Sequence, residues 1–446
     1  MKTYTGYRDL RALSSFKYLE EAGLPLLKES IETFLNCKVE LLFDPVKEAY
    51  IRYNLDVLDS PSLGCFPLDE NTYLIFVRIM EADAMVSGLG IVLSGKSIGA
   101  YRAIIQVLEE VISEKLRKSF LSDFKDCGSL FGERIIVDTI ANYAVRGHID
   151  YQTFQHVLLF FQKLRSTTFE GKPFSTGLVI TKEKYGNTRR GKGEPHREIL
   201  PLTVRKNLKA TLDIDRRFWY LVDGKHTYFV ANKDLEIQHM MVMDPGGQEQ
   251  DYVDSNALSA TLKKGDVMFR VENEKQLSIV CSDGVEFVYQ ENRWRIRDYN
   301  IIKSYIHTVV KEPKVIDRLL YFALYCSRRG ISAVLWVPED LDAIAAYVKP
   351  ESLHTLVYEP LPILENKYSN QLLRYISSDG AAVIDANGYL RYFGCIVDTS
   401  MLRVTEIKGT GEAAAEVLSG NGLSIKISHD GTIKLFLPYE ERPVLI

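Results

Sequence analysis

The sequence predicts a multidomain α/β protein, and three observations support this fold class. The chain has 446 residues, which exceeds the usual size of one domain and predicts two or three domains. Helical and strand-like apolar patterns are mixed over residues 1–175 and again over 310–446, whereas residues 200–305 are mainly strand-like. We therefore expect an α/β region, a β-rich module and a second α/β domain, in this order.

Composition and charge limit the class of function. With 46% hydrophobic and 26% charged residues, the chain resembles an ordinary soluble protein. A net charge of -4 argues against a dedicated nucleic-acid binder, whose domain is usually strongly basic. The first 15 residues lack a signal peptide's apolar stretch, and no run of about 18 apolar residues occurs. We expect a cytoplasmic protein with no membrane contact, and nucleic acid is not its expected partner.

The six cysteines predict neither a zinc site nor a disulfide framework. They are far apart and form no C-x-x-C pair, so we expect buried free thiols in a reducing compartment. These residues are Cys37, Cys65, Cys127, Cys281, Cys326 and Cys395.

The first region contains two apolar runs followed by helices. The segments "TYLIFVRIME" (72–81) and "MVSGLGIVLSG" (85–95) read as a strand pair. The segment 97–116 has apolar residues at helical spacing, and "YQTFQHVLLFFQKL" (151–164) is a second apolar helix.

A phosphate loop of nucleoside-triphosphatases is formally present in this region. Gly90, Gly95, Lys96 and Ser97 satisfy G-x-x-x-x-G-K-S, and a helix follows. However, residues 91–93 are apolar and continue the preceding strand, and the best Walker-B aspartate, Asp138, lies in a helix-like segment. We favour a strand-turn-helix junction and keep the phosphate loop as the alternative.

Residues 182–197 form a basic, glycine-containing loop, for which a solvated linker is favoured over a phosphate-binding or nucleotide-signal site. The β-rich module follows. The segments 216–231 and 277–299 each hold two strand-like runs separated by an Asp-Gly turn.

The last domain alternates helices with apolar strands. We predict a helix over 314–330 that ends at Gly330, a buried strand over 331–337 and a short helix over 339–348. A hairpin through Asn387-Gly388, a helix over 411–418 and a final hairpin over 423–437 complete the domain.

Three segments of this domain, "DGAAVID" (379–385), "KGTGEAAAEVL" (408–418) and "IKISHDGTIKLF" (425–436), occur in a characteristic order. Together they resemble the diadenylate cyclase (DAC) domain, the DisA N-terminal family, which joins two ATP molecules into cyclic di-AMP. The resemblance covers roughly residues 313–438, and the first 300 residues are similar to sensor regions found upstream in some members. It implies a mixed sheet flanked by helices, and a homodimer or higher oligomer in which two ATP-bearing faces meet.

The resemblance implies roles for three residues at the start of the first hairpin. Asp379 matches the acid of the Asp-Gly-Ala motif, whose carboxylate holds a divalent metal ion or removes the proton of the attacking 3′-hydroxyl. The resemblance implies that the small residues Gly380 and Ala381 let the adenosine lie close to the backbone. The alternative is that Asp379-Gly380 is only a turn that starts the strand, because both residues are favoured in turns.

Lys408, Gly409, Thr410 and Gly411 match the nucleotide-binding segment of the family. We predict that Thr410 caps the following helix and that backbone N–H groups at this helix end bind the triphosphate. The family carries Arg-His-Arg after this threonine, whereas this chain has Gly411, Glu412 and Ala413. At roughly 6 Å and an effective dielectric near 20, each lost unit charge is worth about 3 kcal/mol. Replacement cations would come from Lys408, Arg403, the basic loop or a partner subunit.

Asp430, in "SHDG" (428–431), stands where the family has acidic metal-binding residues, and we predict it as a ligand for magnesium or manganese. An Asp-Gly hairpin turn explains the same residues equally well.

The leading hypothesis is a cyclase that forms cyclic di-AMP, or a related dinucleotide, under the control of the upstream regions. The alternative is a catalytically degenerate domain that senses a nucleotide or a partner.

Overall fold

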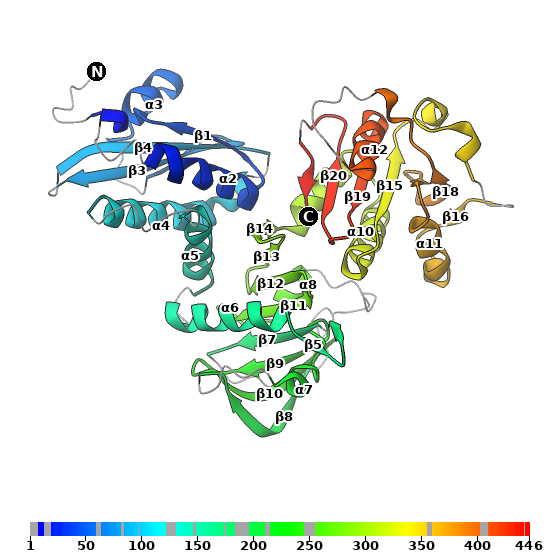
Figure 1. The fold of residues 1–446 in the computed structure, drawn as a ribbon, viewed down its shortest axis with the longest axis horizontal. Coiled ribbons are helices and arrows are strands. Elements are labelled where there is room, and N and C mark those ends of the chain that lie inside the picture. Colours follow the sequence, from blue (N-terminus) through cyan, green and yellow to red (C-terminus); the bar gives the residue numbers. More distant parts are fainter. Residues whose placement is uncertain are drawn as a thin grey trace.

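The computed structural model is a mixed α/β protein with three large sheets (Figure 1). It describes residues 8–12, 19–58, 64–81, 84–96, 98–121, 131–145, 149–173, 175–182, 196–209, 215–244, 255–354, 359–401, 409–440 and 442–446. The basic loop over 183–195, Lys408, Arg403, Cys127 and Ser97 lie outside the described residues. The other five cysteines are free thiols.

The first region is built on an antiparallel sheet with the strand order β1-β4-β3-β2. The predicted strand pair is confirmed as β3 and β4, and alternate residues of β3 enter two different cores. Ile75 and Val77 pack with α2 and α4, whereas Leu74 and Phe76 pack on the side of α3. The elements are β1 (Lys38–Leu42), β2 (Cys65–Asp69), β3 (Thr72–Glu81), β4 (Ala84–Ser94), α2 (Leu24–Leu35), α3 (Pro45–Tyr53), α4 (Arg102–Leu121) and α5 (Phe131–Val145).

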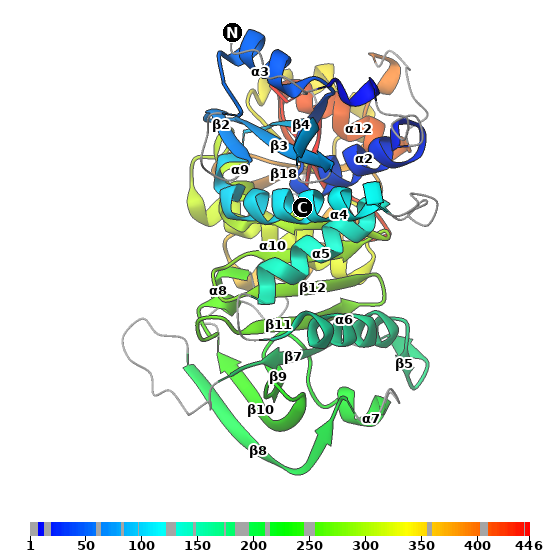
Figure 2. The same ribbon diagram turned by 90° about the vertical axis from the view of Figure 1, so that its left-hand side faces the viewer.

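The β-rich module is a sheet with the strand order β14-β13-β12-β11-β7-β9-β10-β8. The sheet includes β7, which precedes residue 200, and α6 packs across β11 and β12 (Figure 2). One cluster of buried side chains extends from Leu10 to Ile296 and so includes both of the first two predicted regions. The elements are α6 (Tyr151–Arg165), β7 (Thr176–Ile180), β8 (His196–Asn207), α7 (Arg216–Trp219), β9 (Thr227–Ala231), β10 (Glu236–Asp244), α8 (Ser255–Ser259), β11 (Val267–Asn273), β12 (Gln276–Cys281), β13 (Glu286–Gln290) and β14 (Arg293–Arg297), with the small pair β5 (Thr168–Phe169) and β6 (Lys172–Pro173).

The prediction of two strands over 216–231 was wrong for the first of them. Residues Arg216–Trp219 form the short helix α7, because the carboxylate of Asp215 accepts the amide N–H of Phe218 at 3.2 Å. The ring of Phe218 stacks on Phe229 of β9, with ring centroids 4.1 Å apart, so the apolar run is buried without being extended. The second run is the strand β9, as expected.

The last domain contains a mixed sheet with the strand order β16-β18-β17-β15-β19-β20-β21, in which β15 and β17 are parallel. Side chains of α10 and α11 pack on one face and those of α12 on the other. α10 begins at Pro313 and ends before Gly330, whose φ of 64° closes the helix as predicted. The elements are α9 (Tyr299–His307), α10 (Pro313–Arg329), β15 (Ala333–Pro338), β16 (Leu361–Pro362), α11 (Ser369–Ile376), β17 (Ala381–Ile384), β18 (Tyr389–Cys395), α12 (Thr410–Leu418), β19 (Gly422–Ile427), β20 (Ile433–Phe436) and β21 (Val444–Leu445).

The β13–β14 hairpin lies at the centre of the molecule, between the first region and the last domain (Figure 1). On one side it contacts α2 and α5. On the other side, Gln290 Nε2 donates to the carbonyl oxygen of Asp430 at 3.4 Å, and Thr432 Oγ1 donates to Glu291 Oε1 at 2.7 Å. Lys275 Nζ adds a bond to the carbonyl oxygen of His429 at 3.1 Å. The β-rich module therefore holds the 428–431 turn of the last domain.

A buried ionic cluster lies beside this contact. Arg270 and Arg297 of the β-rich module surround Glu272 and Glu286, and Arg328 of α10 reaches Glu272 with its Nε 3.4 Å from Oε2. The side chains of this cluster are at most 7% exposed. The three guanidinium groups lower the pKa of Glu272 even though its burial acts in the opposite direction.

Candidate functional site

Asp379 precedes β17 and is exposed. Its Oδ1 accepts only the neighbouring N–H of Gly380, at 3.0 Å, among the hydrogen bonds that the structure records for it. The hairpin that follows is organised by another carboxylate. Asp385 accepts the amide N–H groups of Asn387 and Tyr389 at 3.0 and 2.9 Å, and it forms an ion pair with Arg391 at 2.6 Å. The hairpin turn at 385–389 therefore does not depend on Asp379.

Gly380 keeps the backbone of β17 close to β18. Its φ is +91°, and a Cβ at this position would lie 2.7 Å from the carbonyl oxygen of Cys395 and the carbonyl carbon of Gly394. Any side chain would therefore displace backbone atoms as well as adopt a strained conformation. Ala381 follows as the first residue of β17 and is buried.

The N-terminus of α12 differs in one detail from the prediction. Gly409 is the N-cap, with φ -64° and ψ 149°, and Thr410 is the first helical residue, with no side-chain cap hydrogen bond. The carbonyl oxygen of Gly409 accepts the amide N–H groups of Glu412 and Ala413, each at 3.0 Å. The N–H groups of Thr410 and Gly411 have no intrahelical acceptor, as in the first turn of any helix.

One cavity of about 560 Å³ brings these segments together. Asp379, Gly380 and Ala381 line it at the start of β17, and Thr410 and Gly411 line it at the start of α12. The remaining described lining residues come from β15, β18, β19, α12 and the segments that flank β15, β17 and β18: Ser332, Ala333, Val334, Ser377, Ser378, Cys395, Ile396, Val397, Thr399, Ala414 and Lys426. The structure thus places five of the seven described candidate residues around one space, with Gly409 adjacent to it in sequence.

Lys426 is the residue of this cavity that the sequence reasoning missed. It is the next-to-last residue of β19 and is 8% exposed. It is also the one cation among the described lining residues. Burial lowers the pKa of its ammonium group, whereas Asp430 and Glu412 act in the opposite direction. One signal was available: in the final hairpin Lys426 pairs directly with Lys434, and like charges in that position are unfavourable.

Glu412, which raised the concern of phosphate repulsion, is bound to a lysine. Its Oε1 accepts from Lys434 Nζ at 2.8 Å, and neither residue is among the described residues that line the cavity. The pair carries no net charge, so much of the repulsion expected from Glu412 alone is cancelled.

Asp430 lies on the 428–431 turn rather than among the described lining residues of the cavity. Its Oδ1 accepts the amide N–H of Thr432 at 2.8 Å, and Gly431 with φ +91° closes the turn. Burial acts to raise the pKa of Asp430, but its hydrogen bonds with Thr432 outweigh this effect, so the pKa is lowered. Within the described part of the chain, no group of three His, Cys, Asp or Glu side chains is placed to hold a metal ion.

The phosphate-loop motif in the first region is a strand followed by a turn and a helix. Residues 90–93 of β4 are paired with β1 on one side and with β3 on the other. Their backbone groups therefore belong to the sheet, and Asp138 lies within α5. Lys96 is ion-paired with Glu440 of the last domain.

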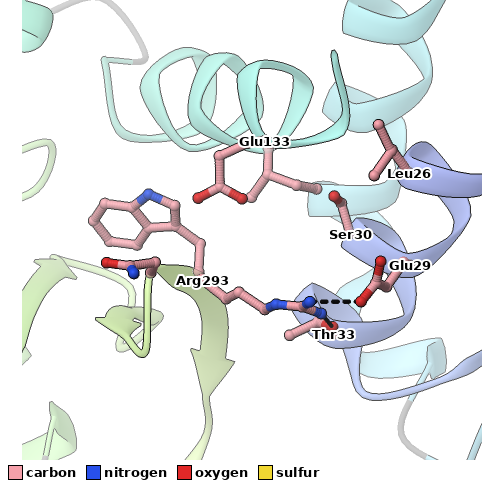
Figure 3. A pocket seen from close by; sticks show the side chains of 9 residues that line it. Leu26, Glu29, Ser30, Thr33, Glu133 and Arg293 are labelled. Carbon is pink, nitrogen blue, oxygen red and sulfur yellow. Dashed lines mark hydrogen bonds and ion pairs between the residues drawn. The ribbon is translucent and has the colours of Figure 1, made fainter. Parts of the chain in front are cut away.

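A second cavity, of about 220 Å³, lies where α2, α5 and the β13–β14 hairpin meet (Figure 3). Arg293 donates to Glu29 Oε1 at 2.5 Å and to Thr33 Oγ1 at 3.3 Å. Glu133 lines the same cavity, and burial raises the pKa of its carboxyl group while Arg293 acts in the opposite direction. The lining thus contains two carboxyl groups, of Glu29 and Glu133, and one guanidinium group, of Arg293. This excess of acidic groups does not suit the binding of a phosphate.

Comparison of the chain with models of known protein families and with curated proteins found no match. None of the described helices is long and apolar enough to cross a membrane.

Proposed function

We propose that the last domain binds an adenine nucleotide in the 560 Å³ cavity and that, as a symmetric dimer, it joins two ATP molecules into cyclic di-AMP. The observation that supports this proposal is the position of Asp379 and Thr410 on one cavity, because they belong to different motifs about 30 residues apart. The cavity has the volume typical of small-molecule and cofactor sites, roughly 300–1,000 Å³.

The reaction requires two nucleotides that face each other. Each 3′-oxygen attacks the α-phosphorus of the other ATP, a new P–O bond forms, and the bond from that phosphorus to the pyrophosphate oxygen breaks. Two pyrophosphates and two protons are released for each cyclic product. In this arrangement the exposed carboxylate of Asp379 accepts the proton of the 3′-hydroxyl or orients that hydroxyl group.

A divalent metal ion fits this site only together with the nucleotide. Asp379 is the one carboxylate among the described lining residues, and Mg²⁺ is commonly held by one or two carboxylates plus substrate phosphates. When bound, such an ion would neutralise phosphate charge and polarise the reacting oxygen atoms. The carboxylate of Asp430 accepts a hydrogen bond within the 428–431 turn. Its role as a metal ligand therefore stays a prediction.

The direct test is incubation of the full chain with ATP and either Mg²⁺ or Mn²⁺, followed by mass spectrometry of the products. A cyclic dinucleotide, formed at a rate that rises steeply with protein concentration in the range where a dimer assembles, would support the proposal. No dinucleotide at any protein concentration with either metal ion would overturn the cyclase activity.

A second candidate is a nucleotide sensor without turnover. It is favoured by one observation: the first turn of α12 carries Gly411, Glu412 and Ala413, with Glu412 held by Lys434, in place of the three basic residues of the family. Calorimetry with ATP, AMP and cyclic di-AMP separates the two candidates. Tight binding of any of them without product formation would identify the sensor, and no binding of all three would remove it.

A further inference from the structure

Lys426 is a buried cation whose recorded hydrogen bonds go to neutral acceptors. Its Nζ donates to Ser332 Oγ at 2.7 Å and to the carbonyl oxygen of Ile427 at 2.8 Å. The two carboxylates that influence its pKa are engaged elsewhere, Glu412 with Lys434 and Asp430 with Thr432. Because a buried charge is costly unless it is paired, an anion that enters the cavity would complete this site.

Gly411 makes the space that the ammonium group occupies. A Cβ at position 411 would lie 2.8 Å from both Cε and Nζ of Lys426, closer than side chains normally approach. The first turn of α12 and the lysine therefore meet at one point of the cavity wall. At that point the positive end of the helix and the amide N–H groups of Thr410 and Gly411 add to the charge of Lys426.

We propose that Lys426 binds the phosphate chain of the nucleotide, in the space left by Gly411. The inference rests on the proposed function and makes it more specific. The polyphosphate lies at the β19 and α12 end of the cavity, and the sugar lies toward Asp379 at the start of β17, with β15 between the two strands. The missing basic triad of α12 is then replaced by one lysine from a neighbouring strand.

The test uses Lys426→Gln, because the amide retains donors for Ser332 and Ile427 but removes the charge. Calorimetry on the full chain measures the affinity for adenosine, ATP and inorganic tripolyphosphate. We expect the variant to lose about 10- to 100-fold for ATP and tripolyphosphate, the effect of one charge-assisted hydrogen bond, with adenosine affinity unchanged. Lys314→Met removes an exposed lysine from α10 and is the control for net charge.

The outcomes separate this inference from the proposed function. ATP binding that is equal in the wild type and in Lys426→Gln would overturn the role of Lys426 and leave the nucleotide site intact. Tripolyphosphate binding that depends on Lys426, without binding of adenosine or ATP, would support the anion site and overturn the nucleotide. No binding of any probe by the wild type would overturn both.

A swap variant covers the case in which Lys426→Gln does not fold. In Gly411→Arg combined with Lys426→Ala, the shortened side chain at 426 makes room for a cation on α12. We expect this double variant to bind tripolyphosphate at least tenfold more tightly than Lys426→Ala alone. Equal affinities of these two variants would contradict the idea that a cation in this space binds the phosphate chain.

Discussion

Asp379 and Asp385 flank the same short strand, β17, but have different partners. Asp385 is buried and accepts two backbone N–H groups and an arginine, whereas Asp379 is exposed at the cavity. We therefore expect the two carboxylates to be separable by mutation. Asp379→Asn should lower the rate of dinucleotide formation by at least about 10²-fold, with a change in stability within about 0.5 kcal/mol.

Asp385→Ala should do the reverse. It leaves the amides of Asn387 and Tyr389 and the guanidinium of Arg391 without their acceptor, so we expect a loss of about 1–3 kcal/mol in the free energy of unfolding. Denaturant unfolding and product analysis of both variants check this pair. An Asp379→Asn protein that is unstable, or fully active, would argue that this residue is only a turn residue.

The second prediction concerns the close approach of Gly380 to β18. Gly380→Ala combines a positive φ with a Cβ 2.7 Å from backbone atoms, and we expect it to cost more than about 2 kcal/mol in stability. Gly171→Ala is the matched control, because Gly171 has φ +75° and no atom within 4 Å of the added Cβ. The control should cost only about 1–2 kcal/mol, the cost of the backbone conformation. Equal losses would show that the contact with β18 is unimportant.

The third prediction is a pH dependence of anion binding. The pKa of Lys426 is lowered by burial, so its charge is lost at a lower pH than that of an ordinary lysine. The affinity for tripolyphosphate should fall as the pH rises through this pKa, by at most about tenfold per pH unit. Lys426→Arg keeps its charge and should abolish this fall. The other charged groups that act on Lys426, the carboxylates of Asp430 and Glu412, are the same in the wild type and in this variant.

The same shift predicts a sign for stability. An unfolded chain restores the ordinary pKa of Lys426, so between the two pKa values the unfolded state binds more protons than the folded state. Stability without ligand should therefore rise with pH in that alkaline window, relative to Lys426→Gln. A wild type that loses stability there, compared with this variant, would contradict the direction of the shift.

The fourth prediction concerns the ion pair between Arg328 and Glu272, which joins the last domain to the β-rich module. Arg328→Met leaves Glu272 with Arg270 and Arg297, so the loss should be smaller than the roughly 3–5 kcal/mol of a broken buried pair. We expect calorimetric unfolding to separate into two transitions in this variant. Arg329→Met, which changes the exposed neighbour, should leave the profile unchanged. Identical profiles for both variants would show that this ion pair does not couple the two parts.

Local sequence patterns predicted most of the helices and hairpins of the last domain. Apolar periodicity, Gly330 and the Asn387-Gly388 turn predict elements because each acts on neighbours within a few residues. The Asp379 and Thr410 segments line one cavity, although they are about 30 residues apart in the sequence. The helix α7 was missed because an N-cap at Asp215 overrides the strand preference of the aromatic residues after it.

Lys426 was missed for a physical reason. In an isolated hairpin, a lysine that alternates with isoleucines indicates a solvent face. Here β19 lies between β15 and β20, and α12 covers the face that carries Lys426, so the same pattern describes a buried cation. The order of strands and the helix above them are long-range facts that a single strand does not encode.

The turn at 428–431 begins two residues after Lys426, and this turn and the adjacent Thr432 are held by Gln290, Glu291 and Lys275 at the edge of the β-rich module. An effector that displaces the β13–β14 hairpin, even by a fraction of an ångström, would thus also displace β19, the strand that carries Lys426. Such a displacement would change the affinity of the proposed site for its nucleotide more than the reaction at Asp379. Any effector of the upstream regions should accordingly alter the apparent KM for ATP more than kcat.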